Sequence, residues 1–379
     1  MIIGIDASRN RSGGTFAHMV GLITEVMPEQ YGVKEIHLWS HKKLLDEIPN
    51  KPWLTKHNPI YLEKNIFQQL FWQRFIFKRE LKLNNCELVF NTTAGSLGKF
   101  QPNVTLSQDM LPFEPGEMQR YKLSLGRLRL IFLKSAYIRA LRHSTAVIFL
   151  TRYASKMIQQ ITGPLSISKV IPHGVNDGFR NIQLSRQWSE EPIGEIRCIY
   201  VSSAAPYKHQ WHVVRAIKLL RTQGISISLT LVGGGDGESQ RRLDEEIRLS
   251  DRDNDFVTQH PFIHIDDIPN LLSNSDLFIF ASSCENMPVT LIEGMASGLP
   301  IACSNRGPMP EVLGNGGVFF DPEDPESIAE AIKLLIKDPK LRKECIETSY
   351  EIASEFLWST NARKTFEFLV ETIKNSQKP

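Results

Sequence analysis

Long hydrophobic runs are absent from this 379-residue sequence. No apolar stretch approaches the roughly 20 residues that a helix needs to cross a bilayer. The first residues, MIIGIDA, are a short apolar run that predicts a β-strand and lacks the pattern of a signal peptide. We therefore expect a cytoplasmic protein, with any membrane contact peripheral and on the inner face of the cytoplasmic membrane.

Cysteine is scarce, and its five positions are odd in number and far apart. This pattern indicates neither a disulfide framework nor a Cys-x-x-Cys metal site. Cys284 has no histidine near it in the sequence to activate a thiolate, so a reduced packing role is favoured over a nucleophilic one. The pattern Gly-x-Gly-x-x-Gly is missing too, even at Gly233–Gly237, so a dinucleotide-dependent dehydrogenase is poorly supported.

The net charge of +2 conceals an asymmetry between the two halves of the chain. Residues 1–175 hold 23 Lys and Arg against 12 Asp and Glu, whereas residues 176–379 hold 21 against 30. The densest basic stretch, residues 120–143, has no acid and interleaves basic with apolar residues, which predicts a basic amphipathic helix. Such a helix can lie on an anionic membrane surface or pack its apolar stripe on its own domain. No nucleic-acid-binding motif accompanies the charge, so we expect no nucleic acid partner.

Apolar strand patterns alternate with helical patterns along the whole chain, which predicts parallel α/β units in both halves. The apolar spacing of Phe67, Phe71, Trp72 and Phe75 favours a helix face in the domain core. Residues 189–194, SEEPIG, lie in a stretch without strong periodicity and predict a linker. We expect one domain at residues 1–178, a second at 195–357, and a C-terminal helix at 358–379 that packs back on the first. The predicted strands are 2–6, 35–40, 88–90, 104–107, 146–150, 169–171, 196–201, 227–232 and 277–281, and the predicted helices begin near 15, 66, 120, 152, 209, 238, 289 and 360.

Two carboxylates, Glu285 and Glu293, lie eight residues apart around a predicted strand-to-helix junction. The apolar run 277–281 predicts a buried strand, and a polar loop leads into a helix that begins near Val289. The N-terminus of a helix attracts a diphosphate, and carboxylates accept hydrogen bonds from hydroxyl-rich ligands. The junction therefore predicts a site for a sugar nucleotide. The alternative is that Glu285 is a solvated loop acid and Glu293 an exposed residue near a helix start.

A second loop with phosphate chemistry follows the predicted strand 196–201 and delivers Lys208 at a helix start. A flexible cation there can neutralise a leaving diphosphate. Near the N-terminus, Gly13 and Gly14 also follow a strand and precede a helix, where backbone N–H groups can approach phosphates.

These motifs resemble those of the retaining GT-B glycosyltransferases of family 4. The likeness is carried by Glu285-x7-Glu293, Gly298-Leu299-Pro300 and Pro310-Glu311-Val312, and is strongest over residues 196–321. The resemblance implies two Rossmann-like domains facing each other across a cleft. It implies that Glu285 contacts the transferred sugar and Glu293 the ribose.

The remaining site residues follow from the same resemblance. Lys208 and Asp109 join Glu285 as catalytic candidates, although Gln108 stands where relatives often carry a histidine. Ser203 occupies the position of a family arginine, which leaves Lys208 alone or calls for a substitute such as Arg306. The implied donor contacts are Gly13, Gly14, Ser202, Ser203, Lys208, Asn286, Met287, Pro288, Val289 and Glu293.

We therefore expect retaining hexosyl transfer, with mannosyl a candidate, from a nucleoside-diphosphate sugar to an oligosaccharide or lipid-linked glycan in cell-surface polysaccharide (lipopolysaccharide or O-antigen) assembly. We expect no cofactor and no metal ion, because Lys208 and the helix amides are available for the diphosphate. The basic N-terminal half predicts contact with an anionic membrane. Two alternatives remain open: a nucleoside-diphosphate-sugar epimerase, and a non-catalytic membrane protein with a degenerate donor site.

Overall fold

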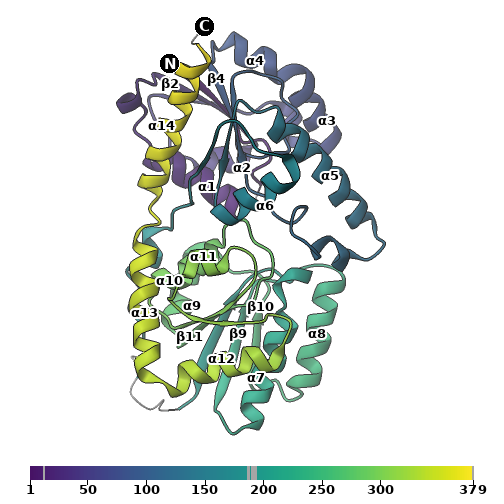
Figure 1. The fold of residues 1–379 in the computed structure, drawn as a ribbon, viewed down its shortest axis with the longest axis vertical. Helices are drawn as coiled ribbons and strands as arrows, with labels where there is room; N and C mark the ends of the chain where they lie inside the picture. Colours follow the sequence, from purple (N-terminus) through teal and green to yellow (C-terminus); the bar gives the residue numbers. More distant parts are fainter. Residues whose placement is uncertain (12, 186–187, 189–193, 378–379) are drawn as a thin grey trace. The chain divides into compact units, whose positions relative to one another are not determined.

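The computed structural model describes residues 1–11, 13–185, 188 and 194–377. The chain divides into two compact units, each built on its own sheet (Figure 1). Unit 1 comprises Met1–Met118, Lys122–Gly174 and Leu357–Pro379, and unit 2 comprises Gln119–Tyr121 and Val175–Phe356. The predicted linker 189–194 lies outside the described residues except for Gly194.

Unit 1 contains a seven-stranded parallel sheet in the order β3-β2-β1-β4-β5-β6-β7. Strand β1, next to the central strand β4, is fully buried at Ile3 and Ile5, as expected where helices cover both faces of a sheet. The edge strand β3 is not among the predicted strands. The strands are β1 (Ile2–Asp6), β2 (Glu35–Trp39), β3 (Leu54–His57), β4 (Leu88–Asn91), β5 (Asn103–Ser107), β6 (Ala146–Phe149) and β7 (Ser168–Val170).

The last helix of the chain, α14 (Trp358–Ser376), packs on α1 (Gly13–Glu25) within unit 1 (Figure 1). The approach is close at Gly21, where an added Cβ would lie 2.4 Å from Cδ2 of Trp358. Glycine is therefore required for this contact. The other helices of unit 1 are α2 (Lys42–Glu47), α3 (Ile66–Phe71), η3 (Trp72–Ile76), α4 (Phe77–Leu83), α5 (Leu125–Arg142) and α6 (Arg152–Thr162), with short 3₁₀ turns η1 (Pro28–Tyr31) and η2 (Ile60–Glu63). The 3₁₀ turn η4 (Glu117–Tyr121) begins in unit 1, and its last three residues belong to unit 2.

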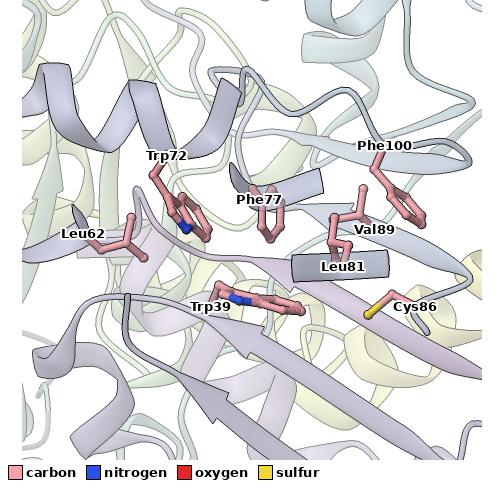
Figure 2. Packing of buried hydrophobic residues seen from close by; sticks show 8 residues of the cluster. All are labelled: Trp39, Leu62, Trp72, Phe77, Leu81, Cys86, Val89 and Phe100. Carbon is pink, nitrogen blue, oxygen red and sulfur yellow. The ribbon is translucent and has the colours of Figure 1, made fainter. Parts of the chain in front are cut away.

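One hydrophobic cluster fills the space between the sheet of unit 1 and α4 (Figure 2). Trp72 and Phe77 are fully buried there, with ring centroids 4.6 Å apart, and Phe77 meets Trp39 edge-on at 5.3 Å. Between α3 and α4, residues Trp72–Ile76 form a π-helical turn. A π-turn holds more residues than an α-helical turn, so it changes the direction in which the following side chains point.

The predicted core role of the neighbouring phenylalanines is wrong. Phe67, Phe71 and Phe75 are 79%, 49% and 63% exposed, and only Trp72 of the predicted face is buried. The three phenylalanines do lie on one apolar face, but this face is exposed. The π-helical turn directs Trp72 and Phe77 to the core instead.

The predicted basic helix begins at Leu125 and not at residue 120. Ser124 caps it, accepting a hydrogen bond of 3.3 Å from the backbone N–H of Arg127. Its residues Leu130, Tyr137 and Leu141 are buried in unit 1. A second apolar set stays exposed at 46% to 97%, formed by Leu123, Leu125, Leu128, Ile131 and Phe132.

Unit 2 contains a six-stranded parallel sheet in the order β10-β9-β8-β11-β12-β13. The chain winds from β8 to one edge and then returns to build the other half from β11. The carboxyl ends of β8 and β11 therefore flank the point where the winding reverses, which is where open α/β sheets bind ligands. The strands are β8 (Ile196–Val201), β9 (Ile227–Val232), β10 (Val257–His260), β11 (Leu277–Phe280), β12 (Ile301–Ser304) and β13 (Val318–Phe320).

Helices cover both faces of this sheet. Those predicted to begin near 209, 238 and 289 begin at Gln210, Glu238 and Val289. The elements are η5 (Asp177–Phe179), η6 (Pro206–Lys208), α7 (Gln210–Thr222), α8 (Glu238–Ser250), η7 (Ile265–Asp267), α9 (Ile268–Ser273), α10 (Val289–Ala296), α11 (Met309–Leu313), α12 (Pro325–Lys337) and α13 (Pro339–Ser354).

Candidate functional site

Lys208 and Glu285 meet at the point where the winding of unit 2 reverses. Lys208 ends the short turn after β8, and Glu285 lies in the loop after β11. The Nζ atom of Lys208 forms an ion pair with Oε1 of Glu285, and the two side chains are 12% and 16% exposed. The same Nζ atom lies 5.6 Å from the ring centroid of Phe280. Water screens this ion pair only weakly, so the two charges attract each other more than they would at the surface.

The two loops that carry this pair are tied to each other by hydrogen bonds. The backbone N–H of Ser283 donates to the backbone oxygen of Tyr207 at 2.8 Å. His209, whose φ of 50° is left-handed, joins its Nε2 to the Ser283 hydroxyl at 2.9 Å. Burial lowers the pKa of His209 to about 3, so this imidazole is neutral at pH 7 and structural. The loops therefore hold Lys208 and Glu285 in a fixed relation.

The glycine-rich turn after β9 forms the wall beside residues 202–204. A Cβ added to Gly233 would lie 2.3 Å from the backbone oxygen of Ser202. A Cβ added to Gly235 would lie 2.6 Å from the backbone oxygen of Ala204. Glycine is required at both positions because the two backbones touch. Ser202 is 8% exposed and its hydroxyl accepts from Gln210 at 3.1 Å, whereas Ser203 is exposed.

Glu293 lies buried on α10 at 7% exposure, so the interpretation as an exposed helix residue is wrong. The helix packs tightly on β11, since an added Cβ at Gly294 would lie 2.7 Å from the Phe278 ring. Burial alone raises the pKa of Glu293 to about 8. No hydrogen bond to its carboxyl group is found among the described residues. A carboxyl group so placed is costly for folding, which is typical of a group kept for a ligand.

The other predicted donor contacts lie along the same junction. Asn286, Met287 and Pro288 are buried, and Val289 begins α10. The junction therefore presents Glu285 before the helix and Glu293 one turn into it.

Two arginines of unit 2 are candidates for the cation that Ser203 does not supply. Arg306 is half exposed and pairs with Asp321 at 2.9 Å. Arg120 binds Glu323 with two contacts, at 3.0 and 2.6 Å, which lowers the pKa of Glu323 to about 2. The charge of Arg120 also lowers the pKa of His209. Arg120 was not among the predicted site residues, because no local pattern relates it to a partner 203 residues away.

The remaining predicted site residues belong to unit 1. Gly13 begins α1 with a φ of +63°, and Gly14 follows it in the same helix. Asp109 is exposed after β5 and accepts a hydrogen bond of 2.7 Å from the hydroxyl group of Tyr137.

An Asp-x-Asp pattern, common in metal-dependent enzymes, does occur at Asp251-Arg252-Asp253 and at Asp253-Asn254-Asp255. Its buried member Asp251 accepts backbone hydrogen bonds from residues 255, 256 and 257 at 2.8 to 3.0 Å. These bonds close the turn between α8 and β10, so Asp251 is structural. Within the described parts of the chain, no cluster of three or more His, Cys, Asp or Glu is placed to hold a metal ion.

Comparison with known proteins finds a family match in the second half of the chain. Residues 181–352 match the family model described as glycosyl transferases group 1. The O-antigen chain mannosyltransferase B of Escherichia coli is 23% identical over 167 residues, 44% of this chain and 44% of that protein. The chain spans about half the length of the curated relatives it matches.

Solved structures match the whole chain. Sucrose-phosphate synthase from Thermosynechococcus elongatus aligns with a TM-score of 0.78 at 16% identity, covering 99% of this chain and 100% of that one. Anabaena HepE in complex with UDP-glucose aligns with a TM-score of 0.72 at 17% identity, covering 98% and 100%. The predicted GT-B fold, with two parallel α/β units, is confirmed.

Proposed function

We propose that this protein transfers a hexosyl group from a nucleoside-diphosphate sugar to a glycan acceptor, with retention of configuration. The observation that carries the proposal is the ion pair of Lys208 and Glu285 at the reversal point of unit 2, together with the buried carboxyl group of Glu293 on the helix that follows the Glu285 loop. These groups match the three parts of such a donor, which are a diphosphate, a sugar and a ribose.

Both members of the ion pair have a role in the proposed reaction. A bound diphosphate competes with Glu285 for the Lys208 ammonium group, and this competition leaves the carboxylate available for sugar hydroxyls. As the bond between the anomeric carbon and the phosphate oxygen breaks, negative charge grows on the leaving diphosphate, and Lys208 stabilises it. The acceptor oxygen bonds to the anomeric carbon, and its proton leaves with the nucleoside diphosphate. Gly13, Gly14 and Asp109 are our candidates for donor and acceptor contacts from unit 1.

The exposed apolar and basic residues of unit 1 favour an acceptor that lies at an anionic membrane. No helix in the described residues is long and apolar enough to span a bilayer. The exposed apolar residues of α5 are interleaved with Arg127, Arg129 and Lys134, and the exposed phenylalanines of α3 and η3 add aromatic surface. Apolar side chains among basic ones suit the boundary between head groups and acyl chains. We propose a lipid-linked glycan in surface polysaccharide assembly, and the mannosyltransferase relative favours mannosyl transfer.

Thermal unfolding with UDP-, GDP- and dTDP-sugars tests donor binding. A donor present at 100 times its dissociation constant should stabilise the protein by about 2.7 kcal/mol. We expect UDP- or GDP-sugars to do so, and UDP-glucose, with which HepE was solved, is one of the donors to test. Stabilisation by no nucleotide sugar would contradict the proposal. Conversion of the donor without acceptor would favour an epimerase, and binding without any conversion a degenerate donor site.

A further inference from the structure

Unit 1 contains a pocket of about 710 Å³ between the π-turn η3, the loop from β4 to β5, and the C-terminal half of α5. This volume lies in the range of small-molecule sites. Its rim carries Arg74, Lys99 and Arg139, its floor carries Asn91 and Thr105, and neither Asp nor Glu lines it. None of these residues has a part in the donor site of unit 2.

The three cations of this pocket are available to a ligand. Arg74, Lys99 and Arg139 are exposed, and none of them forms an ion pair within the described part of the chain. They come from three separate elements, so their convergence on one cavity is a product of the fold. Three like charges repel each other unless an anion joins them, and arginine forks match phosphate oxygens.

The floor of the pocket offers a hydrogen-bond acceptor. Asn91 is 4% exposed and its Nδ2 donates to the Thr105 hydroxyl at 3.4 Å. Its Oδ1 atom is buried and finds no partner among the described residues. A buried amide oxygen without a donor destabilises the fold, and a ligand hydroxyl group would satisfy it. The pocket therefore pairs an anion site with a hydroxyl site.

A buried hydrogen-bond network fixes the walls. The carboxylate of Asp6, at the end of β1, accepts from Gln73 Nε2 at 3.1 Å and from the Ser96 hydroxyl at 2.7 Å. Gln73 precedes Arg74 in the π-turn, and Ser96 itself lines the pocket. The network thus joins the two walls and holds them before any ligand arrives.

The surroundings of the pocket are apolar. Leu97 lines it at 38% exposure, Phe75 next to Arg74 is 63% exposed, and α5 carries the exposed Phe132 as well as Arg139. We propose that this pocket binds the phosphate group, and the sugar hydroxyls next to it, of a lipid-linked acceptor. The proposal deepens the function given above and rests on it for the identity of the ligand as acceptor.

The test measures binding of inorganic diphosphate, glucose 1-phosphate, and phosphatidylcholine vesicles with and without a polyprenyl diphosphate. The pocket variant replaces Arg74, Lys99 and Arg139 by Ser. The control variant removes the same charge from exposed lysines of unit 1 outside the pocket, Lys34, Lys43 and Lys82. All six side chains are exposed, so both variants should fold, which thermal unfolding checks.

We expect the pocket variant to lose about tenfold or more in affinity for the soluble phosphates and for the lipid, and the control variant to lose less than about twofold. Diphosphate can also bind beside Lys208, so the titration is repeated on Lys208→Ala, which should keep the pocket affinity. Equal binding by the pocket and control variants would overturn the proposal. Binding of soluble phosphates without preference for vesicles that carry the diphosphate lipid would overturn the lipid assignment.

UDP-sugar stabilisation is measured on the same variants. If wild-type protein binds diphosphate in the pocket but no nucleotide sugar, the proposed function fails. If the donor binds and the pocket titrations fail, only the present inference is wrong.

Discussion

Replacing Glu293 by glutamine should stabilise the folded protein in a pH-dependent way. Burial raises the pKa of this carboxyl group from 4.5 to about 8, so the folded state holds the proton more tightly than the unfolded state. Stability is then lost as pH rises from about 4.5 through about 8, and above that range the loss is complete. A glutamine of the same shape does not titrate and removes this loss.

The magnitude follows from the size of the shift. At about 1.36 kcal/mol per pKa unit, a shift from 4.5 to about 8 costs about 5 kcal/mol at high pH. Between pH 5 and pH 8.5, wild type should lose about 4 kcal/mol relative to the variant. The difference between two pH values is robust because any fixed cost of burying the amide cancels.

Urea unfolding of wild type and Glu293→Gln at both pH values measures this difference. Glu245→Gln is the control, since Glu245 lies exposed on α8 and should show no such pH dependence. The variant should also raise the donor Michaelis constant more than it lowers turnover, because ribose contacts act in ground and transition states alike. A difference between wild type and Glu293→Gln that does not change from pH 5 to pH 8.5 would refute the reasoning.

Three further predictions concern chemistry and membrane contact. Lys208→Ala should lower turnover by about 10²–10³-fold, and Glu285→Gln should also lower turnover. Release of the nucleoside diphosphate measures both rates, and near-wild-type turnover in both variants would count against the site. Transfer should persist in excess EDTA, because Lys208 and the start of α10 serve the diphosphate, and a complete loss that magnesium or manganese restores would contradict this. Replacing Arg127, Arg129 and Lys134 by Ser should weaken binding to anionic vesicles by about 3 kcal/mol at low salt and spare turnover on a soluble acceptor, whereas unchanged vesicle binding would show that α5 does not contact the membrane.

Strands with strong apolar patterns could be located from the sequence alone. Strands β1, β8 and β9 begin and end where predicted, because they are central or next to the centre of their sheets and most of their residues are apolar and buried. Strands β3, β10, β12 and β13 were not predicted. Strands β3, β10 and β13 are partly buried edge strands, and β3 and β10 mix polar with apolar residues, so their apolar signal is weak. Strand β12 is internal and fully buried, but its four residues are too short a run to give a strong signal.

Properties that depend on tertiary packing could not be predicted. The spacing of Phe67, Phe71 and Phe75 is the same whether that face is buried or exposed, and the apolar pattern of the segment does not indicate the π-turn that decides between them. The full burial of Glu293 depends on how closely α10 packs on β11 at Gly294. The spacing of Glu285 and Glu293 nevertheless located the junction, because a parallel strand followed by a helix delivers both at one end of the sheet.

We propose that this protein transfers a sugar from a nucleotide donor at the Lys208, Glu285 and Glu293 site. NMR of the product formed from the stabilising nucleotide sugar and a glycan acceptor tests this proposal. We expect a new glycosidic bond with the anomeric configuration of the donor, formed by wild type and about 10²–10³-fold more slowly by Lys208→Ala. Absence of a glycosidic product, or equal rates for the two proteins, would contradict it.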